Sequence, residues 1–131
     1  MIKLVGENQR RPNKMPFSEK RRYPRVDKKL PLKLEGEKFD VITETENISA
    51  AGAYCRIGKY LAPFTMLDIS LFLPSKDRAE RVDCKGVVVR TEENLDKTYS
   101  IAIYFSEIKE VDKKKISQYV NYYLKRRQIL Y

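Results

Sequence analysis

The sequence predicts a mainly β fold, a six-stranded antiparallel β-barrel followed by one C-terminal α-helix. Three observations support this fold class. Between residues 30 and 105, apolar side chains recur at every second position in short runs, which is the period of a half-buried strand. Turn-forming or charged stretches separate these runs at close intervals. After residue 112 the apolar period becomes that of a helix. We expect the sheet to close or nearly close, because closure removes exposed strand edges.

The chain has 131 residues, of which 42% are hydrophobic, and this is enough for one small domain with a core. Residues 1–17 combine polar and charged side chains with two prolines and show no apolar period. They are therefore expected to form a flexible basic N-terminal arm. The folded domain is expected over residues 18–131, with the barrel at about 18–108.

The first three strands are expected at residues 30–34, 39–46 and 52–57. Each of them has one apolar face. Pro31 indicates a strand start or a sheet edge, because proline cannot donate a ladder hydrogen bond. Gly52 is expected to open the third strand.

The last three strands are expected at residues 67–73, 82–90 and 99–105, again from apolar alternation. The charged stretches 75–78 and 92–97 separate them. These connections are short, so we expect antiparallel neighbours joined by hairpins.

The helix is expected at about residues 112–127. Its apolar side chains fall at positions i, i+3, i+4, i+7 and i+8, and most remaining positions are basic or polar. They are Ile116, Tyr119, Val120, Tyr123 and Leu124. This stripe is expected to cover an open end of the barrel.

Several classes of active site lack the residues that they need. The chain contains no histidine, which removes the Ser-His-Asp and Cys-His arrangements and leaves too few soft ligands for zinc. Cys55 and Cys84 each lie in an apolar alternating run, and we interpret both as reduced core residues in preference to a disulfide. No enzymatic activity, catalytic residue, metal or bound cofactor is predicted.

No stretch of about 18 apolar residues is present, and the N-terminus does not resemble a secretory signal. We therefore expect a cytoplasmic protein without membrane insertion.

The net charge of +9 is concentrated at the two ends of the chain. Residues 1–29 contain ten Lys and Arg against three Asp and Glu, and residues 109–131 contain seven against two. Residues 30–108 are mildly acidic. This distribution favours a local anion site near the N-terminal segment over a barrel that tracks nucleic acid along its surface.

A basic cluster lies where the folded part begins, and it includes Arg21, Arg22 and Arg25. Guanidinium groups present planar forks that match phosphate oxygens and the O6/N7 edge of guanine. By itself, this cluster could equally be a solvated basic tail.

A second motif follows where two strands should turn, and it contains Asn47, Ser49 and Gly52. Asn and Ser side chains can contact the polar edges of a base. All three residue types are also common in ordinary turns. A turn does not explain their pairing with the arginines, so the two motifs together favour a guanine-containing dianion as ligand.

The RxxxR and NxSxxG motifs, in this order and followed by six strands and a helix, resemble the PilZ domain family, a bacterial receptor module for cyclic di-GMP. The resemblance covers roughly residues 18–125. It implies that Arg21 and Arg25 hold the phosphates and guanines, with Arg22 adding basic character. It also implies that Asn47 and Ser49 contact guanine edges.

For Gly52, the resemblance implies a place where the backbone turns sharply or approaches another chain segment closely. The identity of Lys20 is expected to influence whether one ligand or a stacked pair binds. The implied mechanism is ordering of the N-terminal arm on ligand binding, which a downstream protein partner then recognises.

Two alternatives belong to different classes. The chain could be a small basic barrel that binds RNA or single-stranded DNA through its arms and exposed aromatic rings. It could also be a family member that has lost ligand binding, although the intact arginines argue against this. No nucleic-acid polymer is expected as partner in the favoured hypothesis.

Overall fold

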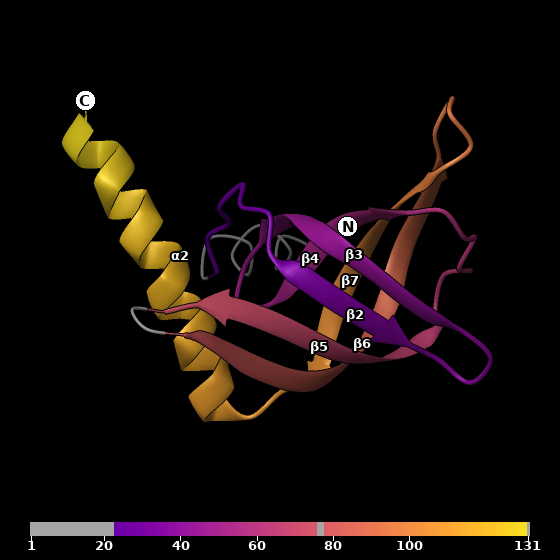
Figure 1. The fold of residues 1–131 in the computed structure, drawn as a ribbon, viewed down its shortest axis with the longest axis horizontal. Helices are drawn as coiled ribbons and strands as arrows, with labels where there is room; N and C mark the ends of the chain where they lie inside the picture. The colour runs from indigo at the N-terminus through magenta and orange to yellow at the C-terminus, as the bar shows by residue number, and fades with distance from the viewer. Residues whose placement is uncertain (1–22, 76–77, 131) are drawn as a thin grey trace, which may run out of the picture.

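The structure is a computed structural model that describes residues 23–75 and 78–130 (Figure 1). It contains a closed barrel of six antiparallel strands and one C-terminal helix. The strands are β2 (Pro31–Glu35), β3 (Asp40–Ile48), β4 (Gly52–Ile57), β5 (Met66–Pro74), β6 (Ala79–Glu93) and β7 (Tyr99–Glu107). Their order around the barrel is β2-β3-β4-β7-β6-β5, and β5 pairs again with β2. The predicted fold class is therefore confirmed.

The core is built from the alternating faces that the sequence indicated. In β5 the side chains of Leu67, Ile69, Leu71 and Leu73 are all buried, and the inward faces of β2, β4 and β7 follow the same period of two. These residues form one apolar cluster inside the barrel.

Four strands are longer than expected, namely β3, β5, β6 and β7, and β6 differs most. β6 covers Ala79–Glu93 instead of 82–90, because its first residue pairs with the end of β5 and its last residue pairs with the start of β7. Both hairpins therefore extend to their turns. In β2, Pro31 is the first residue of the strand, which confirms the strand-start interpretation.

β3 contains an irregularity that changes which face its side chains occupy. Its pairing with β4 shifts register between Thr45 and Asn47. Thr45 is buried, and without the shift Asn47 would point the same way, because alternate residues of a strand share a face. Instead Ile48 is buried and Asn47 is half-buried. Such a bulge re-aims the side chains that follow it.

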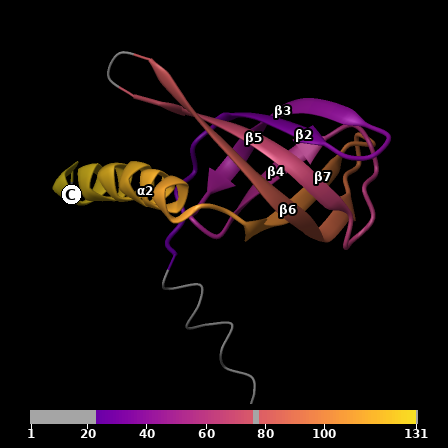
Figure 2. The same ribbon diagram turned by 90° about the horizontal axis from the view of Figure 1, so that it is seen from below.

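The helix α2 covers Glu110–Leu130 and is longer than predicted at both ends. Two acidic residues in its first turn, Glu110 and Asp112, suit the positive end of the helix dipole. Ile116 and Val120 are buried in the same cluster as the barrel residues. Figures 1 and 2 show α2 lying across one end of the barrel, so the predicted capping role is confirmed.

The two cysteines differ in burial, and neither forms a disulfide. Cys55 is fully buried, as predicted, whereas Cys84 is only half-buried at the edge of the core. Among the described residues, no helix combines the length and apolar content needed to cross a membrane.

Candidate functional site

The segment that leads into β2 is attached along β3, and we call residues 23–30 the motif segment. Val26 and Ile48 form an antiparallel bridge in which each amide donates to the other's carbonyl, at 3.1 and 3.0 Å. Both side chains are buried in the core cluster. The motif segment is therefore held by backbone hydrogen bonds and by apolar contact together.

Thr45 of β3 holds the other end of the motif segment. Its Oγ1 donates to the carbonyl of Lys28 at 2.6 Å and accepts from the amide of Leu30 at 2.9 Å. The side chain is 0% exposed, so both backbone groups would be left unpaired without it. Thr45 was not predicted as part of the site, and its only signal in the sequence is a polar residue at an inward strand position.

Arg25 and Asn47 bring the two sequence motifs into direct contact. Arg25 Nη1 donates a hydrogen bond to Asn47 Oδ1 at 2.7 Å, across 22 positions of sequence. Arg25 is exposed and Asn47 is half-buried. This contact depends on the register shift in β3, which turns Asn47 away from the interior. A guanidinium has five N–H donors, and this bond uses one of them.

Ser49 lies at the turn between β3 and β4, where it is only 1% exposed. Its Oγ accepts from the amides of Ala51 and Gly52 at 3.1 and 3.3 Å, and the Ser49 amide donates to the Gly52 carbonyl at 2.9 Å. The hydroxyl is thus engaged in stabilising the turn that follows Asn47. A direct contact between Ser49 and a guanine stays a prediction.

Gly52 is needed for close approach of two strands. A Cβ at this position would lie 2.1 Å from the carbonyl oxygen of Ile103 in β7. Its φ is not positive, so a sharp turn is not the reason for glycine here. Of the two functions considered for Gly52, the structure supports the close approach.

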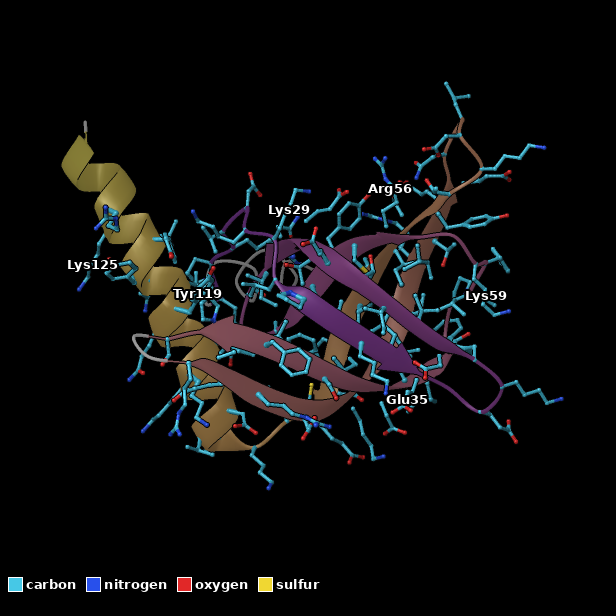
Figure 3. All side chains as sticks on the ribbon, in the orientation of Figure 1. Lys29, Glu35, Arg56, Lys59, Tyr119 and Lys125 are labelled. Carbon is cyan, nitrogen blue, oxygen red and sulfur yellow. The ribbon has the colours of Figure 1, made fainter. Side chains whose placement is uncertain are left out.

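The helix α2 lies beside the motif segment. Lys113 Nζ of α2 is 4.9 Å from the ring centroid of Tyr23, and Lys28 Nζ is 4.1 Å from the ring centroid of Tyr123. These cation–π contacts join the motif segment, which contains Arg25, to the helix. Figure 3 shows Tyr119 between α2 and the barrel, with Lys125 farther along the helix. Lys113 is half-buried against Tyr23, so its side chain is not fully solvated.

Of the six predicted site residues, Arg25, Asn47, Ser49 and Gly52 lie together where the motif segment meets the β3–β4 turn. Arg21 and Arg22 lie outside the described residues. So does Lys20.

A groove of about 620 Å³ lies beside the β2–β3 hairpin, at the other end of the barrel from α2 (Figure 1). Its charged lining includes Glu35, Glu37 and Asp68 against Lys38 and Lys85. This net negative lining does not favour a dianionic ligand. Among the described residues, no group of three or more His, Cys, Asp or Glu side chains could hold a metal ion.

Comparison with known proteins identifies the family and the fold. The sequence model of the PilZ domain family matches residues 19–122. No curated protein matches the sequence.

Among solved structures, the Bacillus subtilis inhibitor of motility (MotI/DgrA) is 24% identical, with a TM-score of 0.70 over 82% of this chain and 50% of its own. The MrkH–c-di-GMP complex of K. pneumonia is 17% identical, with a TM-score of 0.64 over 84% of this chain and 55% of its own. The PilZ domain of YcgR from Escherichia coli, with c-di-GMP, is 12% identical, with a TM-score of 0.57 over 82% of this chain and 92% of its own. At these identities the likeness shows a shared fold. The chain spans about half the length of the MotI and MrkH chains.

Proposed function

The chain belongs to the PilZ domain family, and from this membership we propose that it is a non-enzymatic receptor for cyclic di-GMP. The observation that carries the proposal is the hydrogen bond between Arg25 and Asn47. It joins the RxxxR and NxSxxG motifs, which lie far apart in the sequence, at one place on the surface. Two of the similar structures, those of MrkH and of the YcgR domain, contain c-di-GMP.

The chemistry of these side chains suits a dianion with two guanine bases. Arg25 is exposed, and its planar fork can form charge-assisted bonds with a phosphate or with the O6/N7 edge of guanine. Asn47 can offer both a donor and an acceptor to a base edge. We assign the same phosphate and guanine contacts to Arg21, with Arg22 adding positive charge.

Ser49 and Gly52 have a supporting part in this proposal. The turn bonds of Ser49 and the close strand approach at Gly52 fix the backbone that presents Asn47. Ser49 is also proposed as a guanine contact, which would require its O–H to leave the Gly52 carbonyl, to which it donates at 3.5 Å.

Signalling would follow from the ordering of the N-terminal arm when the ligand binds. Ligand charge attracts the arginines at the base of the arm, and the arm then folds across the barrel to form a surface that a protein partner recognises.

A calorimetric titration tests the proposal, with cyclic di-GMP, cyclic di-AMP and GTP as the three ligands. We expect cyclic di-GMP to bind with a micromolar Kd or tighter, about −8 kcal/mol, and to be clearly preferred. Equal weak binding of all three would reduce the site to a general anion patch. Tight binding of single-stranded RNA or DNA that weakens steeply with salt would favour the polynucleotide alternative.

A further inference from the structure

One polar stripe of α2 faces the motif segment. Lys113, Ser117 and Asn121 are spaced four residues apart, so they line one side of the helix. They run beside the stripe of Ile116 and Val120, which is buried in the core. Lys113 and Ser117 are half-buried, and Asn121 is exposed. The stripe therefore lies at the border between the helix–barrel contact and the solvent.

A cavity lies between this stripe and both sequence motifs. Its volume is about 120 Å³, and its lining comes from three separate parts of the chain. They are Tyr23 and Pro24 from the arginine motif, Ala50 from the turn motif, and Ser117, Val120 and Asn121 from α2. Among the described elements, α2 contributes most to this cavity, because it supplies half of the lining residues.

Two lysine side chains lie between the motif segment and α2, and one of them is beside this cavity. Lys113 lies against the ring of Tyr23, which is itself part of the lining. Lys28 lies against the ring of Tyr123, which is nearer the C-terminal end of α2 than Lys113. These contacts hold both ammonium groups near the motif segment, where they favour an anionic ligand.

From this arrangement we propose that α2 forms the third wall of the ligand site, with Lys113 contacting a phosphate and Asn121 and Ser117 contacting the sugar or base beside it. The proposal rests on the proposed function and adds ligand residues that the two motifs do not contain. Sites for complete ligands are commonly about 300–1,000 Å³, so a cavity of about 120 Å³ holds one part of a dinucleotide. The rest of the ligand would lie over Arg25 and Asn47.

The helix offers matched controls for a test. Lys114 is the neighbouring lysine and Gln118 the neighbouring amide, and both are exposed outside the stripe. Lys113→Ala and Asn121→Ala are compared with Lys114→Ala and Gln118→Ala in calorimetric titrations with cyclic di-GMP at one salt concentration. Each control changes the same charge or the same functional group as its partner variant. Thermal melting of all four variants shows whether the fold is kept.

We expect Lys113→Ala and Asn121→Ala to weaken binding by about fivefold to tenfold, because each loses one polar contact with the ligand. The two controls should bind within about twofold of wild type. If wild type binds and Arg25→Ala does not, but Asn121→Ala binds like Gln118→Ala, the third wall is overturned while the receptor function stands. If wild type itself does not bind cyclic di-GMP, the proposed function fails first.

Discussion

The guanidinium of Arg25 is exposed on the barrel surface, and no core contact depends on it. Arg25→Ala should therefore cost about 2–4 kcal/mol of binding, through loss of a charge-assisted contact, and should barely change the melting temperature. Arg78→Ala is the control, because Arg78 is an exposed arginine at the β5–β6 hairpin. Titration with cyclic di-GMP measures the difference. If Arg25→Ala instead melts far below wild type, Arg25 has a structural function.

Gly52 and Gly58 form a matched pair for stability. In Gly52→Ala the new methyl would lie 2.1 Å from the backbone oxygen of Ile103, and neither strand can move away without breaking the β4–β7 pairing. We expect a loss of at least about 2 kcal/mol in the free energy of unfolding. At Gly58 a Cβ meets no atom within 4 Å, so Gly58→Ala should be neutral or slightly stabilising. Urea denaturation distinguishes the two, and equal stability of both variants would contradict the close approach.

The buried thiol of Cys55 predicts a pH dependence. Burial, with a smaller effect of Glu46, raises the pKa of Cys55 from 9.0 to about 12. Between these values the unfolded chain loses the proton and the folded protein keeps it, so stability decreases as pH rises above 9. The pKa values of Cys84 and Tyr119 are raised in the same direction. The free energy of unfolding should therefore fall less steeply with pH in Cys55→Ala than in wild type, and identical slopes would argue against a buried Cys55.

At the scale of elements, one side chain of β3 holds one end of the motif segment. Thr45→Val keeps the shape of the buried side chain but leaves the Lys28 carbonyl and the Leu30 amide without their hydroxyl partner. We expect a loss of about 1–3 kcal/mol in the free energy of unfolding, together with weaker binding of cyclic di-GMP. Thr43→Val is the control, because Thr43 lies on the same strand and its hydroxyl makes an exposed bond to Arg56. Similar stabilities of the two variants would show that the Thr45 bonds contribute little.

At the scale of the whole molecule, the ordering mechanism predicts a boundary in amide exchange. The amides of Val26 and Ile48 are hydrogen-bonded to each other's carbonyls, so they should be protected without ligand. With saturating cyclic di-GMP, protection should extend to residues 18–25, while β5 and β7 stay unchanged. Full protection of residues 18–25 without ligand would contradict ordering on binding, even if the ligand site is correct.

Local sequence patterns determined the strands, the helix and the barrel. Apolar alternation of period two in residues 30–105 and period 3.6 after residue 112 reflect which side of each element is buried, and burial is the main constraint on such a small domain. The RxxxR and NxSxxG motifs could also be recognised from the sequence, because their residue types and spacing define their chemistry. Element ends were less accurate, since pairing with a neighbour extended β6 to its turns.

Tertiary structure alone decided how these parts meet. The register shift in β3 aims Asn47 at Arg25, and the close approach of β7 explains why Gly52 has no side chain. The sequence also showed two basic ends. Only the fold brings them together, because Lys28 of the motif segment contacts Tyr123 of α2 and Lys113 of α2 contacts Tyr23 of the motif segment. Each of these outcomes depends on contacts between segments that are distant in sequence, and a local pattern of residues does not encode such contacts.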